Sequence, residues 1–321
     1  MTETLLKLTD VRKHFPAGRG ASVKAVNGVS LEIRRGETLG LVGESGCGKT
    51  TLGRTIVKLY RPDGGRIEYG GQDVWSFDRK QNLDYRKKVQ IIYQDPYASL
   101  DPLSVVSTSI AEGLNIHKMY RSSKERHERV LELLRLVGLN PEHANRFPHE
   151  FSGGQRQRIG IARALALEPE LIVCDEPISA LDVSIQAQIV NLMMQLQQDM
   201  GLSYIFITHD LSMVKQISDR IAVMYLGSIV ELAPSDMLYE HHCHPYTQAL
   251  LSAIPIPDPE TERTRKRILL QGDAPNPTAL GDSCDFAGRC PCATDKCRSQ
   301  RPALTEIEPG HWAACHYSQA L

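Results

Sequence analysis

The stretch GESGCGKT, Gly43 to Thr50, fits the pattern of a phosphate-binding loop: Gly, four residues, Gly, Lys and then Ser or Thr. Glycines let the backbone N–H groups of such a loop turn inward around phosphate oxygens, and the helix that follows adds its positive end. Lys49 would reach the β- and γ-phosphates, and the hydroxyl of Thr50 would hold Mg²⁺. We therefore predict a nucleotide site formed by Gly43, Glu44, Ser45, Gly46, Cys47, Gly48, Lys49, Thr50 and Thr51.

A second stretch with chemistry lies far downstream, in LIVCDEP, Leu171 to Pro177, where an apolar strand ends in two acids. Asp175 would stand where a carboxylate can meet a phosphate-bound Mg²⁺, and Glu176 would polarise a water for attack on the γ-phosphate. A strand that ends in Asp-Glu is by itself more often a solvated strand end than a site. Paired with the phosphate loop, it indicates nucleotide hydrolysis.

The third stretch is FSGGQRQR, Phe151 to Arg158, at the start of a predicted helix. A serine and two glycines at a helix N-terminus make a site for an anion. For these three residues alone, a Gly-containing helix cap is the simpler interpretation. The stretch gains weight because it precedes the two acids in a chain that also has a phosphate loop.

Alternating strands and helices must position these residues. TLGLV before the phosphate loop predicts a strand and TLGRTIVKL after it a helix, and KVQIIYQD, LIVCDEP and SYIFITHD predict further strands. QRQRIGIARALALEP and SIQAQIVNLMMQLQQDMG predict helices, the second ended by Gly201. Strands separated by helices of this length predict βαβ units and a largely parallel sheet, so the fold class is α/β.

Between about residues 97 and 155 the pattern is helical instead. SVVSTSIAEGLNI and SKERHERVLELLRLVGL place apolar residues three and four apart, with Ser122 or Ser123 as a helix cap. We interpret this block as a helical subdomain inserted into the α/β core. Beyond about Pro234 prolines accumulate, and five of the eight cysteines lie from Asp282 onward, so the predicted domains are residues 1–235 and a C-terminal extension, 236–321.

With the three motifs in this order, the chain resembles the nucleotide-binding subunits of ABC transporters over about residues 5–235. The resemblance implies a P-loop ATPase that uses ATP and Mg²⁺. It implies catalytic roles for Lys49, Glu176 and His209, the last in ITHD at the place of the switch histidine that contacts the γ-phosphate. A lone histidine at the end of a strand is usually packed or solvated, so His209 gains its role from its place after the acids.

The resemblance also extends to residues outside the phosphate loop. FSGGQ is similar to the signature motif, which closes over the γ-phosphate of the opposite subunit's ATP, so that a dimer encloses two nucleotides. Gln94 resembles the glutamine that joins Thr50 and Asp175 at Mg²⁺ and links to the membrane subunit. The implied residues are Ser152, Gly153, Gly154 and Gln155 in the signature, Ser179 and Asp182 in the D-loop, and Phe15, which stacks on adenine or else belongs to the core. Ile178 stands where many relatives have Thr, and we expect an active hydrolytic site all the same.

The C-terminal cysteines Cys284, Cys290, Cys297 and Cys315 are spaced C-x5-C-x6-C-x17-C, with Cys292 in addition. Four thiolates in one compact loop can hold a [4Fe-4S] cluster or a tetrahedral Zn²⁺, and the spacing decides neither; free thiols are the third alternative. Together with HPYTQALLSAIP, the tail resembles the extension of dipeptide and oligopeptide importer ATPases, which favours the cluster. Because the tail has few large apolar side chains, we expect a metal there to act as a structural staple.

This narrower resemblance implies partners. Such importers carry two different ATPase subunits, two permeases and an external solute-binding protein, and VRKHFP makes this chain more similar to the second, F-type ATPase. The implied location is the cytoplasmic face of a bacterial inner membrane, and the solutes are peptides, or alternatively nickel or opines. A soluble ABC ATPase of DNA repair or of ribosomes would show a coiled-coil insertion or tandem cassettes, and FSGGQ has no role in a P-loop kinase.

Composition is consistent with this interpretation. The 321 residues are 41% hydrophobic and 23% charged, with a formal net charge of −1, so no basic surface field selects nucleic acid as a partner. The opening MTETLLKLTDVRKHF lacks the apolar core of a signal peptide, and no run approaches the roughly 20 apolar residues that cross a bilayer. We expect a soluble chain in a reducing compartment, where cysteines are thiols or metal ligands.

Overall fold

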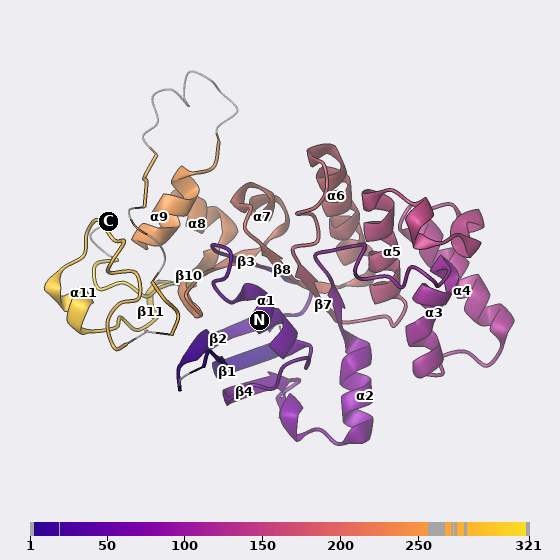
Figure 1. The fold of residues 1–321 in the computed structure, drawn as a ribbon, viewed down its shortest axis with the longest axis horizontal. Coiled ribbons are helices and arrows are strands. Elements are labelled where there is room, and N and C mark those ends of the chain that lie inside the picture. Colours follow the sequence, from indigo (N-terminus) through magenta and orange to yellow (C-terminus); the bar gives the residue numbers. More distant parts are fainter. Residues whose placement is uncertain are drawn as a thin grey trace. The chain divides into compact units, whose positions relative to one another are not determined.

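The computed structural model describes residues 3–18, 20–255, 267–270, 272, 275–278 and 281–318. The chain divides into two compact units. Unit 1 comprises residues 1–5, 33–37 and 69–207, and unit 2 comprises residues 6–32, 38–68 and 208–321. Figure 1 shows the helices and strands of both as a ribbon and labels many of them.

Unit 1 is built on parallel strands, as the sequence predicts. Strands β6 (Val89–Ile92), β7 (Leu171–Asp175) and β8 (Ser203–Thr208) pair in parallel, with Val89 opposite Leu171 and Asp175 opposite Ile207. Every residue of β7 and β8 is buried, which is the pattern of strands covered on both faces. This register matters for the candidate site, because it determines which of the residues just after β6 and β7 lie side by side.

Helices make up the rest of unit 1. They are α2 (Arg79–Lys88), α3 (Val106–Ile116), α4 (Ser123–Leu136), α5 (Gly153–Leu165) and α6 (Val183–Met200), with a short strand β5 (Gln72–Asp73) and 3₁₀ turns at Val74–Ser76, Pro141–Asn145 and Pro148–Glu150. Helices α3, α4 and α5 pack on one another (Figure 1). Helix α2 was missed by the sequence reasoning, because RKQNLDYRKK carries almost no apolar face and buries only Tyr85.

The ends of these helices follow the local sequence. The Ser122 side chain accepts the Glu125 N–H at 3.1 Å, so Ser122 rather than Ser123 is the cap of α4. Ser152 and Gln155 form a reciprocal capping box at the start of α5. Gly201 ends α6 in the left-handed conformation, with φ of 65°, as predicted.

Unit 2 contains two sets of strands. Strands β2 (Ser22–Arg34), β1 (Thr4–Pro16) and β4 (Gly64–Tyr69) are neighbours in one sheet. In the other, β3 (Thr38–Val42) is parallel to β9 (Arg220–Tyr225), and β9 is antiparallel to β10 (Ser228–Pro234). The predicted strand TLGLV, which is β3, thus lies in a parallel pair as expected. The antiparallel pair of β9 and β10 was not predicted; the turn between these strands is too short for a crossover, and that forces the antiparallel arrangement.

The helices among the described residues of unit 2 are short: α1 (Lys49–Ile56), α7 (Leu211–Ile217), α8 (Ser235–Glu240), α9 (Pro245–Ser252) and α11 (Asp295–Ser299). No helix in the described ranges is long and apolar enough to cross a membrane.

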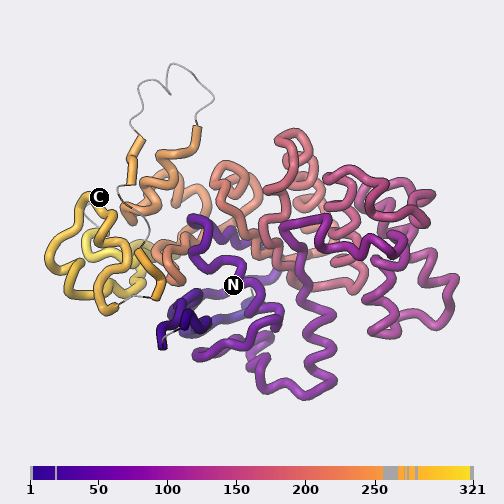
Figure 2. The backbone as a smooth tube through the Cα atoms, viewed as in Figure 1, coloured from indigo at the N-terminus to yellow at the C-terminus, as the bar shows by residue number. Residues whose placement is uncertain are grey.

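The C-terminal segment folds onto the antiparallel edge of unit 2. Strand β12 (His311–Ala313) pairs with β10, and β11 (Thr305–Glu308) pairs with β12. The backbone trace of residues 281–318 doubles back on itself (Figure 2), and Phe286 within it is 2% exposed. The sequence predicted no strands here, because TEIE and HWA are too short to show an alternating pattern. Hydrogen bonds of β12 to β10, and of β11 to β12, stabilise these strands where the local sequence does not.

Candidate functional site

The phosphate loop of unit 2 lies between β3 and α1, and two of its glycines are required by the backbone around it. Gly43 has φ of 153°, and a Cβ there would lie 2.1 Å from the carbonyl oxygen of Met224. Gly48 has φ of 107°, and a Cβ there would lie 1.9 Å from the carbonyl oxygen of Ala25. Both contacts are with main chain, which cannot move aside as a side chain can. The motif's glycines thus let the loop pass between two other segments.

Lys49 is buried at the start of α1 and folds back over the loop. Its Nζ donates to the carbonyl oxygens of Gly43, at 2.7 Å, and of Glu44, at 3.0 Å. Thr50 and Thr51 follow on the first turn of α1, and the positive end of a helix favours an anion there. Burial raises the pKa of the Cys47 thiol, so Cys47 contributes no thiolate to the loop.

Phe15, the predicted adenine contact, lies on β1 in the same unit. Its ring meets Tyr60 edge-on, with centroids 5.3 Å apart, and the Lys13 ammonium lies 5.4 Å from the Phe15 centroid. Tyr60 and Lys13 were not singled out from the sequence; the only signal for Tyr60 is its place just after the phosphate-loop helix.

His209 is exposed directly after β8, and the next residue, Asp210, caps α7 by accepting the Ser212 N–H at 2.8 Å.

In unit 1 the strand register brings Gln94 to Glu176. Ile92 of β6 is opposite Cys174 of β7, and Gln94 and Glu176 each lie two residues farther along their chains. The Gln94 Nε2 donates to the Glu176 Oε2 at 3.0 Å. Asp175, the predicted Mg²⁺ ligand, is buried at the last position of β7. The structure thus unites two residues that are far apart in sequence, as parallel strands that end at one edge require.

Glu176 has a backbone conformation that is rare for a residue with a side chain, with φ of 48°. Its N–H donates to the Ile207 carbonyl oxygen at 3.0 Å, and the Ser179 hydroxyl donates to the Glu176 carbonyl oxygen at 3.1 Å. The first D-loop residue therefore holds the turn that carries the proposed general base. The buried Ile178, which departs from the usual motif, accepts from the Gln186 Nε2 and from the Leu181 N–H at its carbonyl oxygen.

The signature residues lie at the exposed N-terminus of α5. Ser152 caps the helix, and a Cβ on Gly154 would lie 2.5 Å from the Cγ2 of Ile185 on α6. Asp182 is the cap position of α6. Close approach of α5 and α6 therefore puts the signature beside the start of the helix that follows the D-loop, all within unit 1.

The C-terminal cysteines of unit 2 gather around one cavity, which we call the cysteine pocket. It is lined by Cys284, Cys290, Cys292, Cys297 and Cys315 together with His244, among others. All eight cysteines of the chain are free thiols. Burial raises the pKa of Cys290 to about 11 and also raises the pKa values of Cys284 and Cys315. The pocket therefore unites the four predicted ligands and adds Cys292, which the sequence spacing had set aside.

The sulfur atoms of the pocket are not arranged as a closed tetrahedral site. Tetrahedral Zn²⁺ with Zn–S bonds of about 2.3 Å needs sulfurs about 3.8 Å apart. No three of the five pocket thiols, all of them described, have their sulfurs within 4.8 Å of one another. Metal binding would replace the protons that burial keeps on these thiols.

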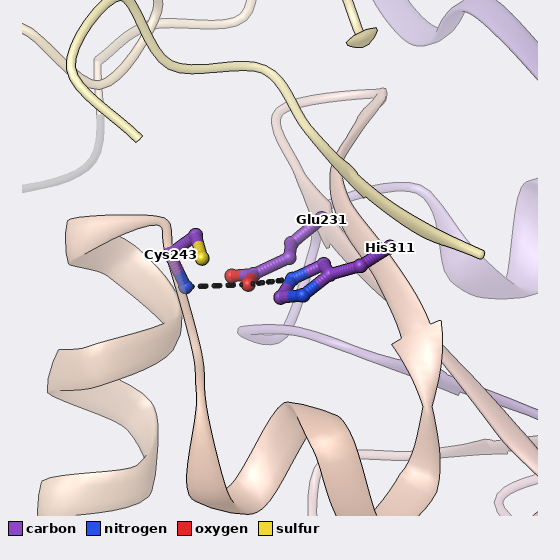
Figure 3. A group of neighbouring side chains, drawn as sticks. All are labelled: Glu231, Cys243 and His311. Atoms are coloured by element: carbon purple, nitrogen blue, oxygen red, sulfur yellow. Dashed lines mark hydrogen bonds and ion pairs between the residues drawn. The ribbon is translucent and has the colours of Figure 1, made fainter. Parts of the chain in front are cut away.

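One carboxylate ties the pocket region to the sheet. Glu231 of β10 accepts the Cys243 N–H at 2.6 Å and a hydrogen bond from the His311 Nε2 of β12 at 2.8 Å (Figure 3). It also accepts the His244 N–H at 3.1 Å. Glu231 and His311 are fully buried. The side-chain atoms of three residues lie at separations that a metal ion could bridge, namely those of Glu231, Cys243 and His311. Both oxygens of the Glu231 carboxylate already accept hydrogen bonds from the protein. We therefore interpret the group as a structural joint, in which hydrogen bonds to Glu231 fix the turn before α9.

His244 lies at that turn and begins α9. Burial lowers the pKa of His244 to about 4, so its ring is neutral, and its Nδ1 accepts the Tyr246 N–H at 3.1 Å. Tyr246 in turn accepts the Glu44 N–H at its hydroxyl, 2.9 Å away. The HPY stretch, part of the resemblance to peptide-importer ATPases, thus holds the phosphate loop through the hydrogen bond between Tyr246 and Glu44.

Comparison with known proteins agrees with these features. Residues 26–179 match the family model described as ABC transporter, and residues 230–297 match the one described as Oligopeptide/dipeptide transporter, C-terminal region. The putative oligopeptide transport ATP-binding protein YkfD of Bacillus subtilis is 56% identical over 97% of this chain and 95% of its own. The chain belongs to the ABC transporter family.

Further relatives have similar names. The oligopeptide transport ATP-binding protein OppF of Bacillus subtilis is 56% identical over 98% of this chain and 97% of its own, and a putative peptide import ATP-binding protein of Brucella ovis is 51% identical over 98% of both. Among solved structures, CbiO1 from Clostridium perfringens, part of the ABC transporter complex CbiONQ, is 26% identical with a TM-score of 0.65, covering 75% of this chain and 92% of its own. The ATP-binding cassette MJ0796, solved as a dimer with ADP and phosphate, is 30% identical with a TM-score of 0.65, covering 72% and 99%.

Proposed function

We propose that this chain is the ATP-hydrolysing subunit that powers import of di- and oligopeptides at the cytoplasmic face of a bacterial membrane. One observation carries the proposal. A buried phosphate-loop lysine, held by the loop's own carbonyls, occurs in one chain with a C-terminal region of the oligopeptide/dipeptide transporter type. The first feature supplies the energy source, and the second supports the solute class.

In the proposed reaction the phosphates of ATP take the place of the Gly43 and Glu44 carbonyls as partners of Lys49. Thr50, Gln94 and Asp175 would hold Mg²⁺, and Phe15 would stack on the adenine. Glu176 would accept a proton from the attacking water, His209 would contact the γ-phosphate, and the products are ADP and phosphate. The hydrogen bond of 3.0 Å from the Gln94 amide to Glu176 orients the carboxylate of this base.

Hydrolysis needs a second subunit in this proposal. The signature residues at the exposed start of α5 would close over ATP held by a paralogous ATPase subunit, and the partner would do the same here. We assign residues 1–235 to the nucleotide-binding domain, about 97–155 to an inserted helical subdomain and 236–321 to the peptide-importer extension.

A surface hollow in unit 1 is the proposed seat for the permease. It has a volume of about 450 Å³ and is lined by Ser99, Asp101, Glu112 and Arg163, with others from the loop after Gln94 and from α3. Ile116 lines it and is exposed, and Leu103 in the same loop is 86% exposed. A helix of a permease that carries a basic and an apolar side chain would complement this surface. The two permeases would receive the solute from an external binding protein.

We further propose that the cysteine pocket holds a [4Fe-4S] cluster through Cys284, Cys290, Cys297 and Cys315. When bound, such a cluster acts as a cross-link among the loops of the tail. Iron and acid-labile sulfide, measured on anaerobically purified protein, should be present and fall in Cys290→Ser and Cys297→Ser. Cys243→Ser, outside the pocket, is the matched control. Stoichiometric zinc in the wild type would overturn the assignment.

The transport function is tested in cells that lack this gene. Uptake of a radiolabelled tripeptide should be lost, return with the wild-type chain and stay absent with Lys49→Ala. Nickel-63 and an opine are tested in parallel as the alternative solutes. Unchanged tripeptide uptake in the deletion strain would refute peptide import, and loss of nickel or opine uptake alone would reassign the solute.

A further inference from the structure

The C-terminal extension reaches the phosphate loop through one side chain. The Arg289 guanidinium grips the Glu44 carboxylate with two parallel hydrogen bonds, Nη1 to Oε2 at 2.8 Å and Nη2 to Oε1 at 3.0 Å. The two residues are 245 positions apart in sequence and belong to the same unit. The Arg289 side chain is 10% exposed and the Glu44 side chain 33%, so the guanidinium end of this fork is shielded from water and the carboxylate end partly so.

Arg289 is itself held by the loop that carries the pocket thiols. It lies between Cys284 and Cys290, and its N–H donates to the Phe286 carbonyl oxygen at 3.0 Å. The Cys284 N–H donates to the Cys297 carbonyl oxygen at 2.8 Å. Phe286 anchors the turn against Tyr225 and Tyr246, with centroids 5.3 and 5.5 Å away. The shape of the cysteine loop therefore sets where the guanidinium stands.

Glu44 is held from the C-terminal side at its backbone as well, because its N–H donates to the Tyr246 hydroxyl at 2.9 Å. At the same time its carbonyl oxygen accepts from Lys49. The residue that Lys49 must release in order to meet a phosphate is thus fixed by Arg289 and Tyr246. Because Glu44 is held, the N-terminal end of the phosphate loop stays in place while Lys49 changes partners. This lowers the conformational cost of ATP binding.

We infer that Arg289 is a positioning residue for ATP binding, and that the cysteine pocket sets nucleotide affinity through the Arg289–Glu44 fork. The inference rests on the proposed function, namely that this loop binds ATP. A filled pocket fixes the 284–290 loop and tightens ATP binding; an emptied pocket frees the loop and weakens it. The extension thereby regulates the ATP site without contacting the nucleotide.

The test measures Mg-ATP affinity by calorimetry and steady-state ATPase kinetics on the full chain purified anaerobically. Arg289→Ala should weaken ATP binding about tenfold, equivalent to about 1.4 kcal/mol, while kcat at saturating ATP changes less than twofold. Arg289→Lys should recover only part of the affinity, since an ammonium keeps the charge but not the fork. Arg298→Ala is the matched control: it lies in the same tail, 66% exposed, and should leave affinity unchanged.

Two double variants test the route. Glu44→Gln with Arg289→Ala should bind ATP no more weakly than the weaker of the two single variants, because both remove one fork; additive losses would overturn the pairing. In a Cys290→Ser background Arg289→Ala should have no further effect, whereas a full tenfold loss there would show that the pocket does not act through Arg289. Arg289→Ala must also retain the iron content of the wild type, since loss of iron would make it a pocket residue instead.

Lys49→Ala separates this inference from the function beneath it. If Lys49→Ala abolishes Mg-ATP binding and Arg289→Ala leaves it unchanged, ATP binding at this loop stands and the inference fails. If Lys49→Ala leaves binding intact, the proposed function itself fails. Thermal unfolding without nucleotide shows whether Arg289→Ala is folded, and should it not be, Arg289→Lys alone must show the affinity loss with unchanged kcat.

Discussion

The left-handed backbone of Glu176 allows its conformational cost to be separated from its chemistry. At φ of 48° a residue with a Cβ costs about 1–2 kcal/mol, and glycine adopts the same conformation freely. Hydrogen bonds on both sides hold the turn, from the Glu176 N–H to Ile207 and from the Ser179 N–H to the Glu176 carbonyl oxygen. We therefore expect Glu176→Gly to be more stable than Glu176→Ala, against the usual order of these two residues.

The size of the effect follows from two opposing contributions. Glycine removes about 1–2 kcal/mol of left-handed strain, and its freer unfolded chain returns about 0.4–1 kcal/mol. The free energy of unfolding of Glu176→Gly should therefore exceed that of Glu176→Ala by about 0.8 kcal/mol at the midpoints of these ranges, and by about 1.6 kcal/mol at most. Glu132, exposed in the middle of α4 in the same unit, is the control position. There the Glu132→Gly protein should be about 1 kcal/mol less stable to unfolding than the Glu132→Ala protein.

The assay is urea unfolding of the four variants, compared at equal m values, together with ATP hydrolysis. All Glu176 variants, with Glu176→Gln included, should lose about 10²- to 10⁴-fold in turnover and still bind ATP, while both Glu132 variants hydrolyse normally. A Glu176→Gly protein less stable than Glu176→Ala would refute the strain at this turn. Full turnover in Glu176→Gln would refute the role of Glu176 in activating water.

Three further outcomes are expected. Phe15→Ala should raise KM for ATP roughly 5- to 100-fold with kcat unchanged, as loss of one base stack of about 1–3 kcal/mol requires, and Phe15→Trp should bind normally; an unchanged KM would place the adenine elsewhere. Glu231→Ala strips the acceptor from buried His311 and from two backbone N–H groups and should lower the free energy of unfolding by about 3–5 kcal/mol, with Glu231→Gln losing less; equal losses would contradict the joint. Burial tends to raise the pKa of Glu170, but hydrogen bonds from Arg35 and Lys88 outweigh it, so the pKa is lowered. Glu170→Gln should therefore lower the free energy of unfolding at neutral pH. The difference in stability between the two proteins should disappear as the pH falls below 4.5, the ordinary glutamate value. A difference that persists in acid would show that the loss is not one of charge.

Local pattern was enough to predict much of the cassette. The strand before Gly43, the helix after Lys49, the strand ending at Asp175 and the stop at Gly201 all follow from periodicity and glycine chemistry, which act between neighbours in sequence. Helix α2, with one buried side chain, and β11 and β12, with a few residues each, carry too little pattern to be found this way. Their stability comes from the partners they pack on.

By itself, the sequence determined the chemistry available to this protein: a phosphate loop, two acids after a buried strand, a capped glycine pair, and a tail rich in thiols. Only the tertiary structure decided which of these residues meet. Parallel register brings Gln94 to Glu176, and pairing of β12 with β10 buries His311 against Glu231. Folding of the tail carries Arg289 to Glu44, a contact between residues 245 positions apart that no local pattern encodes, because its energy arises only when both side chains leave water together.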